Sequence, residues 1–362
     1  MVSDSSPVLG DLATPCLVVD TDVLEGNLQA MAAHARQRGL ALRPHAKTHK
    51  CLEIARRQLA LGAVGLTLAT VGEAEVFLAA GITDLFIAYP VWAAGSWGTR
   101  LRAVAEQSTL RVGVDSTEGA EVLARALSGT DAVAVIEVDS GHHRTGVLPE
   151  QVGQVAAAAA RAGLCVGGVF TFPGHGYAPN RREHAAADEA RALREADGAL
   201  RRAGIDAGMR SGGSSPTAAL ADDTTLTEMR PGVYVFNDAQ QVELGAADWG
   251  NLALTAASTV VSRSGRSLVV DAGSKILGAD QPAWATGGGR LPDHPNARIT
   301  ALSEHHATVS FPNGEAMPDL GSVLRVAPNH VCAAVNLSDE LVISRHDAVV
   351  DTWQVAARGR NS

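Results

Sequence analysis

LRVGVDSTEGAEVLARALSG, residues 110–129, contains the unit from which the fold is built. Its first six residues are mostly apolar and β-branched, which predicts a buried strand. TEGAEVLARALSG (117–129) has the apolar spacing of an amphipathic helix and is closed by a glycine. A strand followed directly by such a helix is typical of parallel β/α units, because parallel strands need long crossovers.

The same alternation recurs on both sides of this unit. Helical patterns also occur at 51–62 and 182–204. Alternation over about two hundred residues predicts an α/β fold with a closed (β/α)8 TIM-type barrel over residues 21–245, since parallel strands in this number close without an edge. The eight strand-like runs are 40–44, 65–70, 84–89, 110–115, 133–139, 167–172, 208–213 and 229–236.

The pattern changes after Gly245. Short Val/Thr-rich runs separated by Gly, Pro, Asn or Asp predict an antiparallel β domain over residues 246–362. TPCLVVDTD (14–22) is a further strand that precedes the first helix, and we expect residues 1–20 to join this second domain. ATGGGRLPDHP (285–295) is expected to be a loop.

Composition narrows the function classes. The chain has 362 residues and a net charge of −9, so nucleic acid is not an expected partner. No window approaches the roughly 18 apolar residues of a membrane helix, and MVSDSSPVLGDL lacks a signal-peptide pattern, so we expect a cytoplasmic protein without membrane association. The four cysteines are scattered, and we expect them to be reduced.

Polar motifs follow several of the expected strands, at the barrel end where active sites are found. RPHAKTHK (43–50) gathers cations, for which a solvated face is the alternative interpretation. Arg144 lies in DSGHHRTG (139–146), where a structural ion pair is the alternative. Gly212, Gly213 and Ser214 open an expected helix whose free N–H groups suit a phosphate, although an ordinary glycine turn is equally compatible. A lysine, an arginine and a phosphate site together suggest pyridoxal 5′-phosphate (PLP).

These motifs resemble those of the fold-type III PLP enzymes, the alanine-racemase-like barrel family. Within that family the chain looks like the branch of D-serine dehydratase, D-threo-3-hydroxyaspartate dehydratase and D-threonine aldolase. The resemblance spans nearly the whole chain in the expected order. The motifs that carry it are TPCLVVD, RPHAKTHK, EVDSGHHRTGV, SGGSSPT, RPGVYVFND and PNHVC.

The resemblance implies roles for individual residues. Lys47 is similar to the Schiff-base lysine, and the cations around it are expected to favour its neutral form. Arg144 matches the arginine that binds the phenolic oxygen of PLP, and Tyr177 looks like the tyrosine near the pyridine nitrogen. The backbone at four further residues resembles the phosphate-binding positions: Gly213, Ser214, Gly232 and Val233.

PNHVC places His330 and Cys332 two residues apart in an expected loop. In an extended chain both side chains point to the same side, and Cys with His favours zinc. Such a pair alone is a weak signal, since a buried cysteine beside a surface histidine is commoner. The family resemblance implies a catalytic zinc on this pair, whereas the aldolases typically carry His-x-Asp with an ion of the manganese type.

We therefore expect a PLP- and zinc-dependent lyase that dehydrates D-serine or 3-hydroxy-D-aspartate to a keto acid and ammonia. The alternative is D-threonine aldolase chemistry, which releases glycine and an aldehyde. A PLP-binding protein without turnover would lack the β domain with its metal pair. The resemblance also implies a homodimer. All three tyrosines precede the β domain, so a racemase with a tyrosine acid in that domain is not expected.

Overall fold

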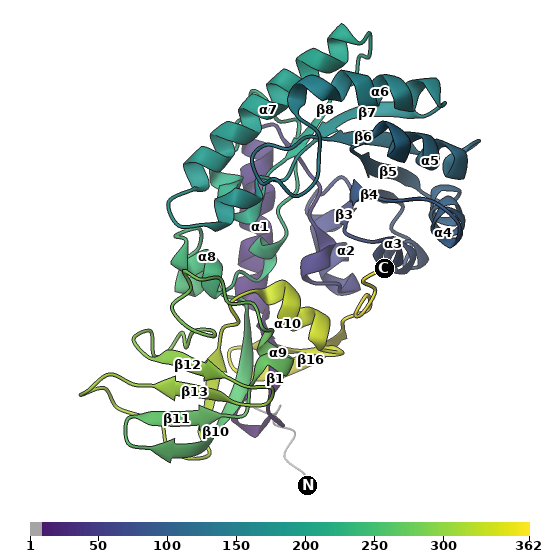
Figure 1. The fold of residues 1–362 in the computed structure, drawn as a ribbon. Coiled ribbons are helices and arrows are strands. Elements are labelled where there is room, and N and C mark those ends of the chain that lie inside the picture. The colour runs from purple at the N-terminus through teal and green to yellow at the C-terminus, as the bar shows by residue number, and fades with distance from the viewer. Residues whose placement is uncertain (1–8) are drawn as a thin grey trace. The chain divides into compact units, whose positions relative to one another are not determined.

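The computed structural model describes residues 9–362 (Figure 1). Residues 1–8 lie outside the described part, and with them most of the N-terminal stretch considered for a signal peptide. The chain forms two compact units. One comprises residues 30–47, 54–232 and 360–362, and, of the described residues, the other comprises 9–29, 48–53 and 233–359. The division therefore differs from the expected limits of 21–245, since residues 21–29, 48–53 and 233–245 group with the β domain.

The first unit is the expected barrel. Its strands are all parallel and follow the order β2-β9-β8-β7-β6-β5-β4-β3. A parallel bridge between His45 and Thr67 joins the two ends of this order, which closes the sheet. The strands are β2 (Ala41–Leu42), β3 (Leu66–Leu68), β4 (Asp84–Pro90), β5 (Thr109–Val114), β6 (Val133–Glu137), β7 (Cys165–Phe170), β8 (Met209–Gly212) and β9 (Glu228–Met229).

Helices follow the strands and lie outside the strands of this unit (Figure 1). The helix expected to open at Gly212–Ser214 is the 3-10 helix η5 (Ser215–Leu220), not an α-helix. The eighth strand is shorter than expected, because Pro231 has no N–H to donate and the chain turns into a short 3-10 helix, η6 (Val233–Val235). The α-helices of the unit are α2 (Leu52–Ala60), α3 (Val71–Ala79), α4 (Ser96–Ala105), α5 (Thr117–Leu127), α6 (Val152–Arg161) and α7 (Arg182–Arg202), and α1 (Thr21–Gln37) enters it.

The second unit contains the mostly antiparallel sheet, in the order β12-β13-β11-β10-β1-β15-β16 with β14 on β10. The N-terminal strand β1 (Cys16–Asp20) joins this sheet as predicted, antiparallel to β10 and parallel to β15. The segment 285–295 lacks regular strands or helices, as expected. The other strands are β10 (Leu254–Ser264), β11 (Ser267–Val270), β12 (Arg298–Leu302), β13 (Ala307–Ser310), β14 (Val323–Val326), β15 (Glu340–Arg345) and β16 (Ala348–Gln354).

Three short helices complete this unit: α8 (Ala239–Glu243), α9 (Ser274–Leu277) and α10 (Val331–Leu337). The prediction of a loop at PNHVC is wrong at its end, because α10 begins at Val331 and Cys332 lies in its first turn. His330 keeps an extended backbone just before the helix. Among the described residues, no helix is long and apolar enough to cross a membrane.

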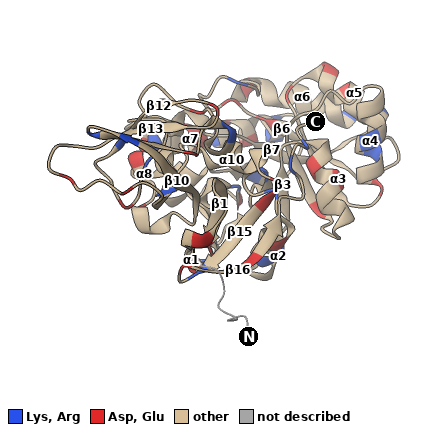
Figure 2. Ribbon diagram, turned by 90° about the horizontal axis from the view of Figure 1, so that it is seen from below, with Lys and Arg blue, Asp and Glu red and all other residues tan. Residues whose placement is uncertain are grey.

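Charged residues of both signs occur on the same parts of the barrel unit (Figure 2). Arg100 on α4, for example, pairs with Glu75 on α3, with 2.7 Å between Nε and Oε1.

Candidate active site

Lys47 is the lysine best placed to carry an aldehyde cofactor. The chain has only three lysines: Lys47, Lys50 and Lys275. The amino group of Lys50 is buried and donates a hydrogen bond to Asn336 Oδ1 at 2.7 Å, and Lys275 forms an exposed ion pair with Glu304. Lys47 lies in the 3-10 turn η2 (Ala46–Thr48) that follows the first barrel strand, with its side chain half-buried.

The aromatic ring of Phe172 stands at the centre of the predicted cofactor residues. Lys47 Nζ lies 5.8 Å from the ring centre, and the Arg144 guanidinium lies 5.3 Å from it. The Tyr177 ring is 6.1 Å away, and the His142 ring meets Phe172 edge-on at 5.4 Å. The structure thus brings Lys47, Arg144 and Tyr177 together, and these groups fit an anionic, aromatic cofactor. Phe172 is the last residue of the expected strand 167–172, and no local sequence pattern indicates its role.

The cations of RPHAKTHK do not form a solvated face. Arg43 is buried, with its side chain 3% exposed, and its Nε donates to Glu228 Oε2 at 2.8 Å. Its Nη1 pairs with Asp84. His49 is buried and its Nδ1 accepts from the Cys51 N–H at 3.1 Å. Two carboxylates therefore pair with Arg43, so its charge lies inside the barrel unit and not on a solvated face.

The loop that carries Arg144 is held at both ends by carboxylates. Asp139 accepts hydrogen bonds from the Gly141 and His143 N–H groups, at 2.9 and 3.0 Å. Glu137, the last residue of β6, accepts from the Thr145 hydroxyl at 2.9 Å. Burial raises the pKa of Glu137 to about 7, although the Thr145 hydrogen bond and the nearby Arg144 oppose this. Arg144 is therefore presented from a short loop that these hydrogen bonds hold in place.

The turn predicted to bind phosphate already uses two of its N–H groups. Gly213 donates to Oε1 of Glu189 at 2.7 Å, and Ser214 donates to the Thr217 hydroxyl at 3.1 Å. The expectation of free N–H groups thus differs from the structure at these two residues, because the buried Glu189 of α7 accepts from Gly213 and the Thr217 side chain accepts from Ser214. Gly232 lies between β9 and η6, and Val233 is the first residue of η6. Their phosphate contacts stay predictions.

His330 and Cys332 come together. Burial lowers the pKa of the His330 imidazole, but the charge of Cys332, hydrogen bonds to Cys332 and Asp238, and the charge of Asp238 outweigh it, so the pKa is raised well above its ordinary value. Within residues 9–362 no group of three or more His, Cys, Asp and Glu side chains is arranged to hold a metal ion. An imidazole and a sulfur at one place fit a divalent cation that keeps open positions for other ligands.

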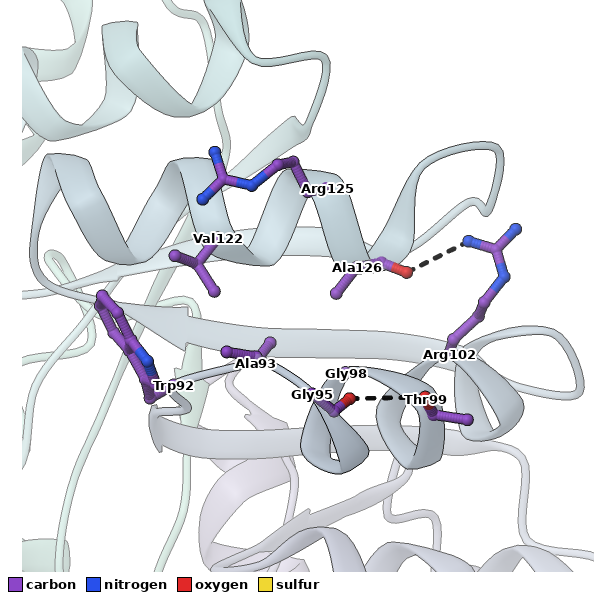
Figure 3. Close-up of a pocket in the computed structure, with 10 residues that line it drawn as sticks. Trp92, Ala93, Gly95, Gly98, Thr99, Arg102, Val122, Arg125 and Ala126 are labelled. Atoms are coloured by element: carbon purple, nitrogen blue, oxygen red, sulfur yellow. Dashed lines mark hydrogen bonds between the residues drawn. The ribbon is translucent and has the colours of Figure 1, made fainter.

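A separate cavity of about 640 Å³ lies between α4 and α5, beside the exposed Trp92 (Figure 3). Its charged lining residues are Arg102 and Arg125. Arg102 donates to the Ala126 and Ser128 carbonyls at the end of α5. None of the predicted site residues lines this cavity, and its lining contains no histidine, carboxylate or thiol for acid–base chemistry.

A parallel barrel followed by a mostly antiparallel β domain is the architecture of the alanine-racemase-like barrel proteins. The chain belongs to the alanine racemase N-terminal domain family of PLP-dependent proteins, whose sequence pattern matches residues 19–240. Residues 253–344 match a second family, described as a putative serine dehydratase domain. The predicted family and the predicted fold class are thereby confirmed.

Curated relatives cover nearly the whole chain. A D-threonine aldolase from Arthrobacter sp. is 35% identical over 97% of this chain and 94% of its own length. A D-threo-3-hydroxyaspartate dehydratase from Delftia sp. is 31% identical over 95% of this chain and 97% of its own. Both are named lyases of D-hydroxy amino acids.

Solved structures agree with these relatives. D-threonine aldolase from Filomicrobium marinum superposes with a TM-score of 0.89 at 31% identity, covering 99% of this chain and all of its own. A cysteine-to-alanine variant of D-threo-3-hydroxyaspartate dehydratase in a metal-free form gives a TM-score of 0.89 at 30% identity, with 96% and 98% covered.

Proposed function

We propose that this protein is a PLP- and zinc-dependent lyase that dehydrates a D-3-hydroxy amino acid, D-serine or 3-hydroxy-D-aspartate, to a keto acid and ammonia. The observation that carries the proposal is the pairing of His330 with Cys332, since a sulfur ligand favours zinc over harder cations. The relative solved in a metal-free form as a cysteine variant supports a cysteine–metal connection in that dehydratase.

Lys47 is the residue that we propose to bind PLP and then to move the substrate proton. Of the three lysines it alone lies beside Phe172, Arg144 and Tyr177, and the other two are held by Asn336 and Glu304. With PLP and substrate bound, the Lys47 amine would be the base that takes the Cα proton. Arg144 binds the phenolic oxygen of the cofactor, and Tyr177 lies near its pyridine nitrogen.

When bound, PLP supplies an electron sink for negative charge at Cα, and the divalent cation supplies a Lewis acid for the β-hydroxyl. His330 and Cys332 hold that cation. The backbone of Gly213, Ser214, Gly232 and Val233 is proposed to bind the phosphate, which requires that Gly213 exchange its hydrogen bond with Glu189 or share it.

A second candidate, D-threonine aldolase activity, is favoured by one specific observation. The Arthrobacter D-threonine aldolase is more similar to this chain, at 35% identity, than the Delftia dehydratase, at 31%. The same residues serve this reaction if the β-hydroxyl loses its proton instead of leaving. The Cα–Cβ bond then breaks, and glycine and an aldehyde are released.

Product analysis separates the two. Purified protein with PLP is incubated with D-serine, D-threonine and D-threo-3-hydroxyaspartate, with zinc and separately with manganese, and products are identified by mass spectrometry. We expect keto acid and ammonia with zinc. Glycine and an aldehyde in place of these products would refute the dehydratase proposal and support the aldolase. No turnover of any D-3-hydroxy amino acid would refute both.

A further inference from the structure

Asp238 is a fully buried carboxylate beside the proposed metal ligand His330. It is 0% exposed, and its Oδ2 lies 3.4 Å from His330 Nδ1. The same Oδ2 accepts the N–H of Val331, the residue after His330, at 3.1 Å. The other oxygen, Oδ1, accepts the Gln241 N–H at 3.0 Å and so caps helix α8. One carboxylate therefore contacts both the side chain of His330 and the backbone next to it.

The position of this carboxylate determines which imidazole nitrogen is available. A carboxylate at Nδ1 favours the tautomer with its proton on Nδ1, which leaves the lone pair of Nε2 for a cation. The 3.4 Å separation is longer than a charge-assisted hydrogen bond, which is about 2.7–2.9 Å, and Nδ1 has no hydrogen-bond partner among the described residues. A movement of the imidazole ring toward Asp238 would therefore be needed to form that hydrogen bond. The Asp238 carboxylate is held in its position, because its two oxygens accept the N–H groups of Gln241 and Val331.

The sulfur has a comparable neighbour. Thr48 is fully buried, and its hydroxyl oxygen lies 3.3 Å from Cys332 Sγ. A thiolate has no proton to donate, so a cation-bound Cys332 would accept the hydroxyl proton of Thr48. The His-Cys pair is thus contacted on each side by a buried polar group of the same unit.

We propose that Asp238 is a positioning residue that orients His330 toward a divalent cation and raises the affinity of the His330–Cys332 pair for it. The inference rests on the proposed function, since that proposal makes these two residues the metal ligands. Removing such a partner typically weakens metal binding by about 10–100-fold. Asp238 was not singled out from the sequence, because only folding brings residues 238 and 330 together.

The test uses the full-length, PLP-loaded protein and measures the zinc dissociation constant by competition with a chromophoric chelator. Asp238→Asn keeps the shape and one acceptor oxygen. Asp238→Ser keeps a cap for α8, since serine is a good N-cap, but is too short to reach His330. We expect both variants to bind zinc about 10–100-fold more weakly, with a near-native circular dichroism spectrum and unchanged PLP absorbance.

Asn237→Gly is the matched control. Asn237 is the neighbouring buried residue, has a φ of 52° that glycine accepts, and donates to the Tyr234 and Asn251 carbonyls without contacting His330. This variant should lose stability and keep the wild-type zinc affinity. If it loses zinc as strongly as the Asp238 variants, the effect is general loosening and the positioning role is overturned.

His330→Ala and Cys332→Ala distinguish failure of the inference from failure of the proposed function. If both bind zinc as the wild type does, the proposed metal site itself is wrong. If they lose zinc while Asp238→Asn and Asp238→Ser bind it with wild-type affinity, the metal site stands and only the role of Asp238 is refuted.

Discussion

The buried carboxyl of Glu189 should make the stability of the protein depend on pH. Glu189 is 0% exposed on α7, and its Oε1 accepts the Gly213 N–H, while Oε2 has no hydrogen-bond partner among the described residues. Burial raises the pKa of this carboxyl from 4.5 to about 7, against the opposing effects of the Gly213 N–H and the positive charge of Arg230. The folded protein therefore retains a proton on Glu189 that the unfolded chain has lost.

The size and sign of the effect follow from this difference. Between pH 4.5 and about pH 7 the folded state binds more protons at Glu189 than the unfolded state, so the free energy of unfolding falls as the pH rises. At about 1.4 kcal/mol for each pKa unit, the total loss is about 3 kcal/mol, and it is complete above pH 7. Glu189→Gln removes this loss, because glutamine is neutral at every pH and still accepts from Gly213.

Urea unfolding of wild-type and Glu189→Gln protein at pH 5 and pH 8 measures the effect. We expect the variant to gain about 2.5 kcal/mol relative to the wild type between pH 5 and pH 8, because part of the total loss already lies below pH 5. The other buried carboxyl with a pKa of about 7, Glu137, is present in both proteins, and its contribution cancels in the comparison. Glu195→Gln, an exposed position on the same helix, should show no comparable change. A difference between Glu189→Gln and wild type that is the same at both pH values would refute the reasoning.

Two further predictions concern the cofactor lysine and the buried charges of the barrel. Borohydride reduction of the PLP-loaded protein should attach the cofactor permanently to Lys47, as peptide mapping would show. The Lys47→Ala variant should lose the visible absorbance of bound PLP, whereas Lys50→Ala and Lys275→Ala should keep it. Cofactor attached to Lys50 or Lys275 would remove Lys47 from its role. Glu228→Ala leaves the buried Arg43 without one of its partners and should lower the free energy of unfolding by about 3–5 kcal/mol in chemical denaturation. Glu106→Ala breaks an exposed pair with Arg102 and should lower it by at most about 1 kcal/mol. Equal losses in the two variants would contradict the buried pairing.

The sequence by itself determined the architecture. Strand and helix periodicity is a local property, so the alternation around residues 110–129 predicted the parallel barrel, and the Val/Thr-rich runs after Gly245 predicted the antiparallel sheet. Even the membership of β1 in that sheet was predictable, because TPCLVVDTD precedes the first barrel helix. The ends of elements were predicted less well from the sequence. Helix α10 begins inside PNHVC, and the eighth barrel strand already ends at Met229.

Only the tertiary structure decided how the polar groups pair. Arg43 pairs with Glu228, which lies 185 positions away in the sequence. The first cation of RPHAKTHK is therefore buried and neutralised. Glu189 accepts a hydrogen bond from the Gly213 N–H, and Asp238 lies beside His330. Lys47, Arg144 and Tyr177 all lie near the ring of Phe172. Residue type and spacing show which groups a chain has. The partner of a buried charge depends on which distant strands and helices pack together, and no local pattern records that choice.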